Sequence, residues 1–219
     1  MTPAPEDTYI RDWGLSMRPW ITRLAQALKP FSGSGQSFSE WKAVSDARLD
    51  ALSRVFGEPD PNMFHSRTPF NRGGYADVYH FVRPDYHVYV TADLTANPGA
   101  YQIPSLLGSY VLVMCAPEPS QSAAELISRL ARYTMEAVIE PGHTMDLNIS
   151  SSLEAAVFLQ WPETTPFNFN GVEYGLLLLV GISSAELKLS TERGSDTLIE
   201  RLVAANVIPV TNPDRTSVI

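Results

Sequence analysis

Cysteine is nearly absent from this sequence, which has 219 residues and a single thiol at Cys115. One cysteine cannot form an intramolecular disulfide, so the fold must hold together without a covalent cross-link. This excludes the disulfide-stapled folds of small secreted proteins. Because Cys115 also ends the apolar run 111–115, we expect a buried thiol in a reducing compartment and therefore a cytoplasmic protein.

Long hydrophobic runs are missing as well, and no stretch reaches the roughly 18 to 20 apolar residues of a membrane-spanning helix. The opening residues MTPAPED contain neither a basic nor an apolar segment, which predicts that no secretory signal is present. Hydrophobic residues still make up 44% of the chain and charged residues 18%. This composition supports a buried core and excludes a chain that is disordered throughout.

Positive charge is in short supply, with 16 Lys and Arg against 24 Asp and Glu, a net charge of −8 and a pI near 5.0. An acidic surface repels phosphate groups, so we expect neither nucleic-acid binding nor attachment to anionic membranes. The same surface would attract a basic protein and speed their encounter. The charge alone does not distinguish this role from simple solubility.

Residues 1–38 are predicted to form a helical extension and a linker. Apolar residues recur there at helical spacing, namely Ile10, Trp13, Met17, Trp20, Leu24 and Leu28. Pro19 should kink this helix or start a new one. The Gly/Ser-rich linker that follows lacks the Gly-Lys-Ser/Thr ending of a phosphate-binding loop. The apolar stripe would pack either on the main domain or on a second copy of the chain, which leaves a homo-oligomer through this helix open.

Residues 39–219 are predicted to form one α/β (α+β) domain. Helices are expected from a cap at Ser39 to about Phe56, over 122–138, and from a cap at Ser195. Strands are expected at 78–82, 87–94, 106–115, 155–161 and 175–182. The first two strands flank Arg83-Pro84-Asp85 and should form a hairpin, while 106–115 and 175–182 are apolar enough to be central strands. This order predicts a mixed central β-sheet with helices on both faces.

Histidines are the first candidates for chemistry. In the predicted hairpin His80 and His87 lie diagonally on one face, where a carboxylate such as Asp93 would complete a metal site. No Cys-x-x-Cys or His-Glu-x-x-His spacing supports such a site, so we favour strand histidines packed beside aromatic residues. His143 is predicted to lie on a loop with Asp146 nearby. We favour a role in tying that loop to the backbone, because no Gly-x-Ser-x-Gly motif supplies a nucleophile.

Ser183 and Glu186 have the spacing of a helix capping box, which gives both residues a structural task. Arg215, in the polar C-terminal segment, is expected to pair with a buried carboxylate. The predicted burial of Cys115 makes it a poor nucleophile. The sequence therefore predicts no catalytic residue, no metal ligand and no cofactor, and a protein that is not an enzyme.

Six ordered segments between Val78 and Ser217 together resemble the Suppressor of fused family. They are VYVTADL at 88–94, SYVLVM at 109–114, LARY at 130–133, GHT at 142–144, LLVGISSAEL at 178–187 and VTNPDR at 210–215. Each motif is short, and their order over about 140 residues makes the match specific. Val111 departs from the pattern, since the family usually has glutamate there, which puts in doubt any binding role of that position.

The resemblance implies a Suppressor of fused N-terminal-domain-like fold and a non-enzymatic protein. The chain is similar to short, single-domain bacterial members, which are widely placed among the immunity proteins of polymorphic toxin systems. The resemblance also singles out a set of motif residues, for which we expect a structural role: Leu130, Arg132, Tyr133, Gly142, His143, Gly181, Glu186, Leu187, Thr211 and Arg215. It does not locate the surface that binds a partner.

Two hypotheses follow. In the first, the chain binds and masks a toxin domain, which would be basic if it is a nuclease. In the second, it is a regulatory scaffold that adds an endogenous partner peptide to an exposed sheet edge.

Overall fold

The computed structural model of this chain describes residues 38–66, 74–92, 94, 102–103, 105–161, 167–169 and 172–219. The predicted helical extension and its apolar stripe lie outside these residues. The described helices are α2 (Phe38–Phe56), α3 (Gln121–Tyr133), α4 (Ser184–Arg193) and α5 (Ser195–Ala204). The described strands are β1 (Val78–Val82), β2 (His87–Thr91), β3 (Ser109–Ala116), β4 (Thr144–Asp146), β5 (Ala155–Gln160), β6 (Phe167–Phe169) and β7 (Val172–Ile182).

The described strands form one mixed sheet in the order β1-β2-β3-β7-β5-β4, with β6 pairing to β7. Its central pair, β3 and β7, is parallel, and every other pair is antiparallel. The two strands predicted to be central are therefore the central ones. Their apolar sequences fit this position because both of their faces are covered.

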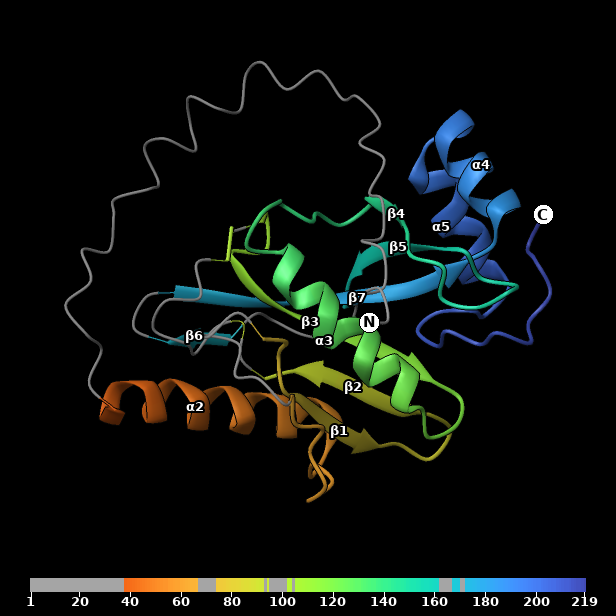
Figure 1. The fold of residues 1–219 in the computed structure, drawn as a ribbon. Helices are drawn as coiled ribbons and strands as arrows, with labels where there is room; N and C mark the ends of the chain where they lie inside the picture. Colours follow the sequence, from red (N-terminus) through yellow and green to blue (C-terminus); the bar gives the residue numbers. More distant parts are fainter. Residues whose placement is uncertain are drawn as a thin grey trace, which may run out of the picture.

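Successive side chains of β3 point to opposite faces of the sheet, and each face has its own core. Leu112 packs on one side with Ile127 and Leu130 of α3. Val111 and Val113 pack on the other side, in a core that includes Phe56 of α2, Leu189 of α4 and Leu202 of α5. Figure 1 shows α3 lying across the sheet, with α4 and α5 together at one end and α2 at the other. The predicted mixed sheet with helices on both faces is confirmed.

The hairpin prediction is also confirmed, since Val82 pairs with His87 and the N–H of Arg83 donates to the carbonyl of Tyr86 at 2.9 Å. Helix α2 begins one residue before the expected cap at Ser39. The expected cap at Ser195 is wrong. Gly194, with a φ of 89°, occupies the cap position of α5 and Ser195 is the first helical residue. Glycine suits this position because α4 ends there and the chain must turn sharply into α5.

Several other boundaries differ from the prediction, and two short strands were not predicted. β3 begins at Ser109, because residues 105–108 form a turn in which Ser105 and Gly108 exchange backbone hydrogen bonds of 3.0 Å. α3 ends at Tyr133, where turns replace the helix predicted to reach residue 138. β4 and β6 were not predicted, since strands of three residues are too short for a clear alternation.

Candidate functional site

Glu186 lies at the centre of a buried polar cluster at the end of the sheet near α4 and α5. Its side chain is fully buried, and it forms an ion pair with Arg215, whose side chain is 9% exposed. Nη1 of Arg215 donates to Oε1 at 2.7 Å and Nη2 donates to Oε2 at 2.6 Å. This two-point contact fixes the guanidinium and the carboxylate in one plane, which is the strong geometry for such a pair.

The same carboxylate also caps α4. It accepts the N–H of Ser183 at 2.8 Å, while the hydroxyl of Ser183 accepts the N–H of Glu186, so the predicted capping box is confirmed. Oε1 further accepts the N–H of Val218 at 2.9 Å. Although burial opposes its charge, these hydrogen bonds and Arg215 hold the pKa of Glu186 below its ordinary value.

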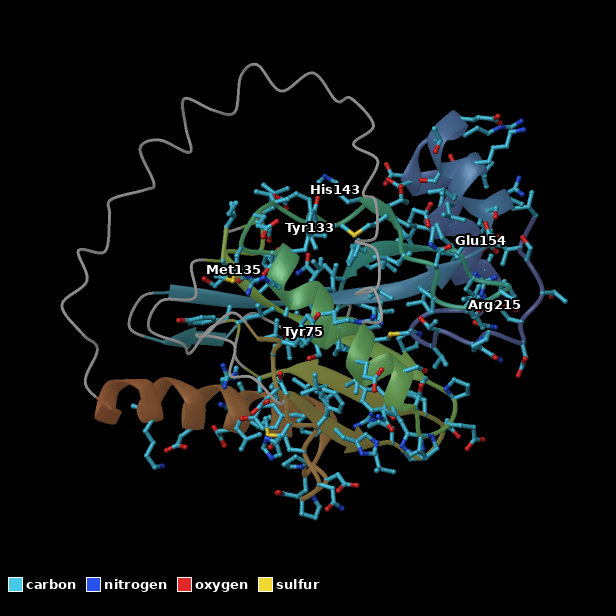
Figure 2. The ribbon with its side chains drawn as sticks, in the orientation of Figure 1. Tyr75, Tyr133, Met135, His143, Glu154 and Arg215 are labelled. Atoms are coloured by element: carbon cyan, nitrogen blue, oxygen red, sulfur yellow. The ribbon has the colours of Figure 1, made fainter. Side chains whose placement is uncertain are left out.

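Gly181 and Thr211 extend this cluster into β7. The hydroxyl of Thr211 accepts the N–H of Gly181 at 2.9 Å, and Nη2 of Arg215 donates to the carbonyl of Gly181 at 2.9 Å. A Cβ at Gly181 would stand 2.7 Å from Cγ2 of Thr211 and 2.9 Å from Cδ1 of Leu153, which is too close for any other residue. Four of the ten family-motif residues thus meet at one place (Figure 2, where Arg215 is labelled).

The motif residues of α3 lie elsewhere. Leu130 is buried in the core beneath α3, Tyr133 is half-buried against the same core, and Arg132 is exposed. Figure 2 shows Tyr133 and Met135 at the C-terminal end of α3, away from Arg215. Leu187 is half-buried on α4 and packs on the opposite core. The structure therefore does not bring all ten residues into one site.

Gly142 and His143 form the turn that leads into β4. Gly142 has a φ of 88°, a left-handed conformation that glycine adopts readily, and its N–H donates to the carbonyl of Phe158 at 2.7 Å. Nδ1 of His143 accepts the N–H of Glu140 at 3.2 Å, as expected of a histidine that ties a loop to the backbone. The surrounding protein lowers the pKa of His143 by desolvation, and the charge of Glu140 partly offsets this. His143 forms no hydrogen bond with Asp146 in the described residues.

His80 and His87 meet as the hairpin predicts, with Nε2 of His80 2.9 Å from Nδ1 of His87. The ring of His80 also stacks on Tyr89, with centroids 5.0 Å apart, and its Nδ1 lies 3.3 Å from Oδ2 of Asp60. Asp93, the third ligand considered from the sequence, is outside the described residues. Within the described ranges, no three His, Cys, Asp or Glu side chains are placed to hold a metal ion.

Cys115 is fully buried in β3, and burial raises the pKa of its thiol to about 12. A thiol that stays protonated is a weak nucleophile, in line with its predicted lack of reactivity.

The two outer strands of the sheet differ in how their edges are used. Residues 59–64 of the chain itself run along β1, where Val78 and Phe64 exchange hydrogen bonds of 2.9 and 3.0 Å and the N–H of Asp60 donates to the carbonyl of His80. These bonds occupy the polar groups that a further strand would need.

The outer edge of β4 is different. His143 accepts the N–H of Phe158 in β5, and Leu147 donates to the carbonyl of Glu154, the residue before β5. Thr144 and Asp146 alternate with them and therefore direct their N–H and C=O groups away from β5. No strand or bridge among the described residues pairs with this edge. From the sequence, the segment that contains His143 and Asp146 was expected to be a loop. Polar and apolar residues alternate from Thr144 to Ile149, but only three of them form β4, so the alternation is too short to mark a strand on its own.

Comparison with known proteins agrees with the resemblance found in the sequence. The family model described as Suppressor of fused protein (SUFU) matches residues 75–216. Among curated proteins, none matches this sequence.

Solved structures that share the fold include the following three. A chain from the Sufu–Fu complex has 15% identity and a TM-score of 0.64, with 81% of this chain and 91% of that chain covered. A suppressor of fused homolog from Neisseria gonorrhoeae has 15% identity and a TM-score of 0.60, with coverages of 81% and 98%. Drosophila Suppressor of Fused has 15% identity and a TM-score of 0.65, but the match spans 79% of this chain and only 50% of the Drosophila chain.

No helix in the described part of the chain combines the length and apolar composition that crossing a membrane requires.

Domains of the SUFU type are protein-interaction domains, and proteins of this family bind and regulate other proteins without catalysis. The chain belongs to the Suppressor of fused family.

Proposed function

We propose that this chain is an immunity-type protein of the cytoplasm, which binds a toxin domain of a bacterial polymorphic toxin system and masks it. Membership in a family of protein-interaction domains supports binding. The net charge of −8 is the observation that favours a basic partner, because opposite charges accelerate encounter and like charges repel acidic competitors.

The experiment is to co-express this chain with the toxin domain encoded beside its own gene. Cells that express the toxin domain alone should stop growing, and cells that express both proteins should grow. The two proteins should also co-purify. Equal growth arrest with and without this chain contradicts the proposal, and so does a gene neighbourhood that contains no toxin.

The second candidate is a regulatory scaffold that adds an endogenous partner peptide to the sheet. The open backbone groups of Thr144 and Asp146 on β4 favour this candidate, because an extended peptide binds to an unpaired edge by main-chain hydrogen bonds. The other outer strand, β1, is already paired by residues 59–64.

The substitution Thr144→Pro tests edge addition within the same co-expression and pull-down assays. It removes an outward N–H without breaking the ladder between β4 and β5, and Thr144→Val is the matched control that keeps this N–H. If the partner adds to β4, the proline variant loses binding and the valine variant retains it. Equal binding by both variants excludes edge addition at β4, and a housekeeping regulator in the pull-down favours the scaffold over the immunity protein.

We also propose that Gly181, Glu186, Thr211 and Arg215 stabilise the fold and do not contact the partner. Arg215 donates to Glu186 and to the carbonyl of Gly181, Thr211 accepts the N–H of Gly181, and Glu186 has no exposed surface left to offer a partner.

A further inference from the structure

A groove lies between α5, the end of β5 and the Pro141–Gly142 turn, with a volume of about 520 Å³. Its walls are largely apolar: Leu159 comes from β5, and Ile199 and Val203 come from α5. Val203 is 57% exposed, so its side chain offers apolar surface to the groove. We call this feature the α5 groove.

The spacing along α5 explains how the groove forms. Leu198 and Leu202 are fully buried and face the core, so they fix the rotation of the helix. Asp196, Ile199 and Val203 are three and four residues apart and therefore share a second face, which lines the groove. Of the two apolar residues, Ile199 also packs against the core, whereas Val203 is largely exposed.

Asp196 supplies the charge of the groove. It is exposed, and its carboxylate forms no hydrogen bond or ion pair with the described residues. Arg193 stands three residues earlier, but it ends α4 before the break at Gly194 and does not pair with Asp196. Glu200, one turn further along α5, is exposed and adds charge of the same sign. The groove thus joins apolar walls to an unpaired negative group.

We propose that the α5 groove accepts a long cationic side chain, an arginine or a lysine, from the partner protein. The aliphatic stem of such a side chain would pack on Ile199 and Val203, and its charged head would reach Asp196. A neutral apolar side chain would leave Asp196 unused, and an acidic side chain would be repelled by it. The partner's identity rests on the proposed function, but the groove can be tested without any partner.

The test is an NMR titration of the purified, isotope-labelled chain with two small probes. n-Butylguanidinium and n-pentanoate share a four-carbon stem and carry opposite charges. The cation should shift the backbone amide signals of Asp196, Ile199 and Val203 with millimolar affinity. It should bind about threefold or more tightly than the anion, as expected for one exposed charge pair.

Substitutions then assign the preference. Asp196→Asn should bring the two probes to equal affinity, while the matched control Asp214→Asn, which removes an exposed charge outside the groove, should leave the preference unchanged. Val203→Glu adds a negative charge to the groove wall and should weaken binding of pentanoate, whereas Asp196→Asn removes a negative charge and should not. The inference is overturned if the native protein binds pentanoate and butylguanidinium with equal affinity, or if the shifted signals lie outside the groove. It is also overturned if Asp214→Asn removes the preference as Asp196→Asn does. A negative titration does not bear on the co-expression result, and a negative co-expression result does not bear on the titration.

Discussion

Glu186 joins two segments that are 29 residues apart in the chain, the start of α4 and the C-terminal residues that follow Thr211. One carboxylate receives hydrogen bonds from Ser183, Arg215 and Val218. Removing it would leave the guanidinium of Arg215 largely buried without its counter-charge. Such a loss is costly because the desolvation of the remaining charge is no longer compensated.

We therefore expect Glu186→Ala to lower the free energy of unfolding by about 3 to 5 kcal/mol. Urea denaturation followed by circular dichroism measures this change. Glu192→Ala is the matched control on the same helix, because Glu192 is 57% exposed and lies 3.8 Å from Lys188. The control should change stability by no more than about 0.5 kcal/mol. Similar losses in the two variants would show that the Glu186 cluster does not stabilise the fold.

The pKa of Glu186 adds a pH signature. Its folded pKa lies below the ordinary value of 4.5, so the unfolded chain binds the proton more readily than the folded one. The stabilisation is therefore present above pH 4.5 and is lost as the pH falls through the folded pKa. In Glu186→Gln, which cannot titrate, the decline in stability below pH 4.5 should be shallower than in the native protein.

Sequence spacing predicted part of this cluster and not the rest. Ser183 and Glu186 are three residues apart, so local helix geometry predicts their contact. The partner of Arg215 depends on where the C-terminal segment crosses the sheet, which no local pattern contains. The need for glycine at position 181 has the same origin, because Thr211 and Leu153 approach it from distant parts of the chain.

At the scale of elements, the β1–β2 hairpin holds two histidines in direct contact. The facing nitrogens of His80 and His87 are 2.9 Å apart, so one proton must be shared between them. Burial lowers the pKa of His80, Asp60 raises it and His87 lowers it further. The proton of His80 is thus bound more weakly in the folded hairpin than in the unfolded chain.

NMR titration of the imidazole signals should show His80 titrating below its ordinary value of 6.5. Asp60→Asn should lower this pKa further, and His87→Gln should raise it, because each variant removes one of the opposing charges. The hairpin's contribution to stability should be complete above pH 6.5 and decline as the pH falls through the folded pKa. A higher pKa of His80 in Asp60→Asn, or a lower one in His87→Gln, would contradict the geometry.

Elements were predictable where they are long and periodic. The apolar runs of β3 and β7, the helix α3 and the hairpin register follow from local residue patterns within one helix or two neighbouring strands. Ser195 was mistaken for a cap because serine is a common cap residue, whereas the tight turn between α4 and α5 places Gly194 there. The short strand β4, which carries the open edge, was hidden by its length.

The described part of the molecule is one sheet with a core on each face, and Cys115 lies in the core that α2, α4 and α5 cover. Its strand, β3, is paired on one side with β2 and on the other with β7, and both α3 and the helices of the opposite face cover it. The sequence predicted these layers because they follow from the order and polarity of the strands. The sequence could not predict the α5 groove or the open edge of β4, because both depend on how the helices and strands pack against one another.

Because Cys115 is fully buried and its thiol has a pKa of about 12, a thiol reagent should reach it only when the sheet opens as a unit. We expect an aromatic disulfide reagent to label Cys115 at least about a thousandfold more slowly in the native protein than in the unfolded chain, as a cooperative domain requires. Ser151→Cys places a second thiol at an exposed turn and should react at once in the same sample. Labelling of Cys115 that keeps pace with the thiol at position 151 would mean that β3 opens locally, and the two cores would then not form one cooperative unit.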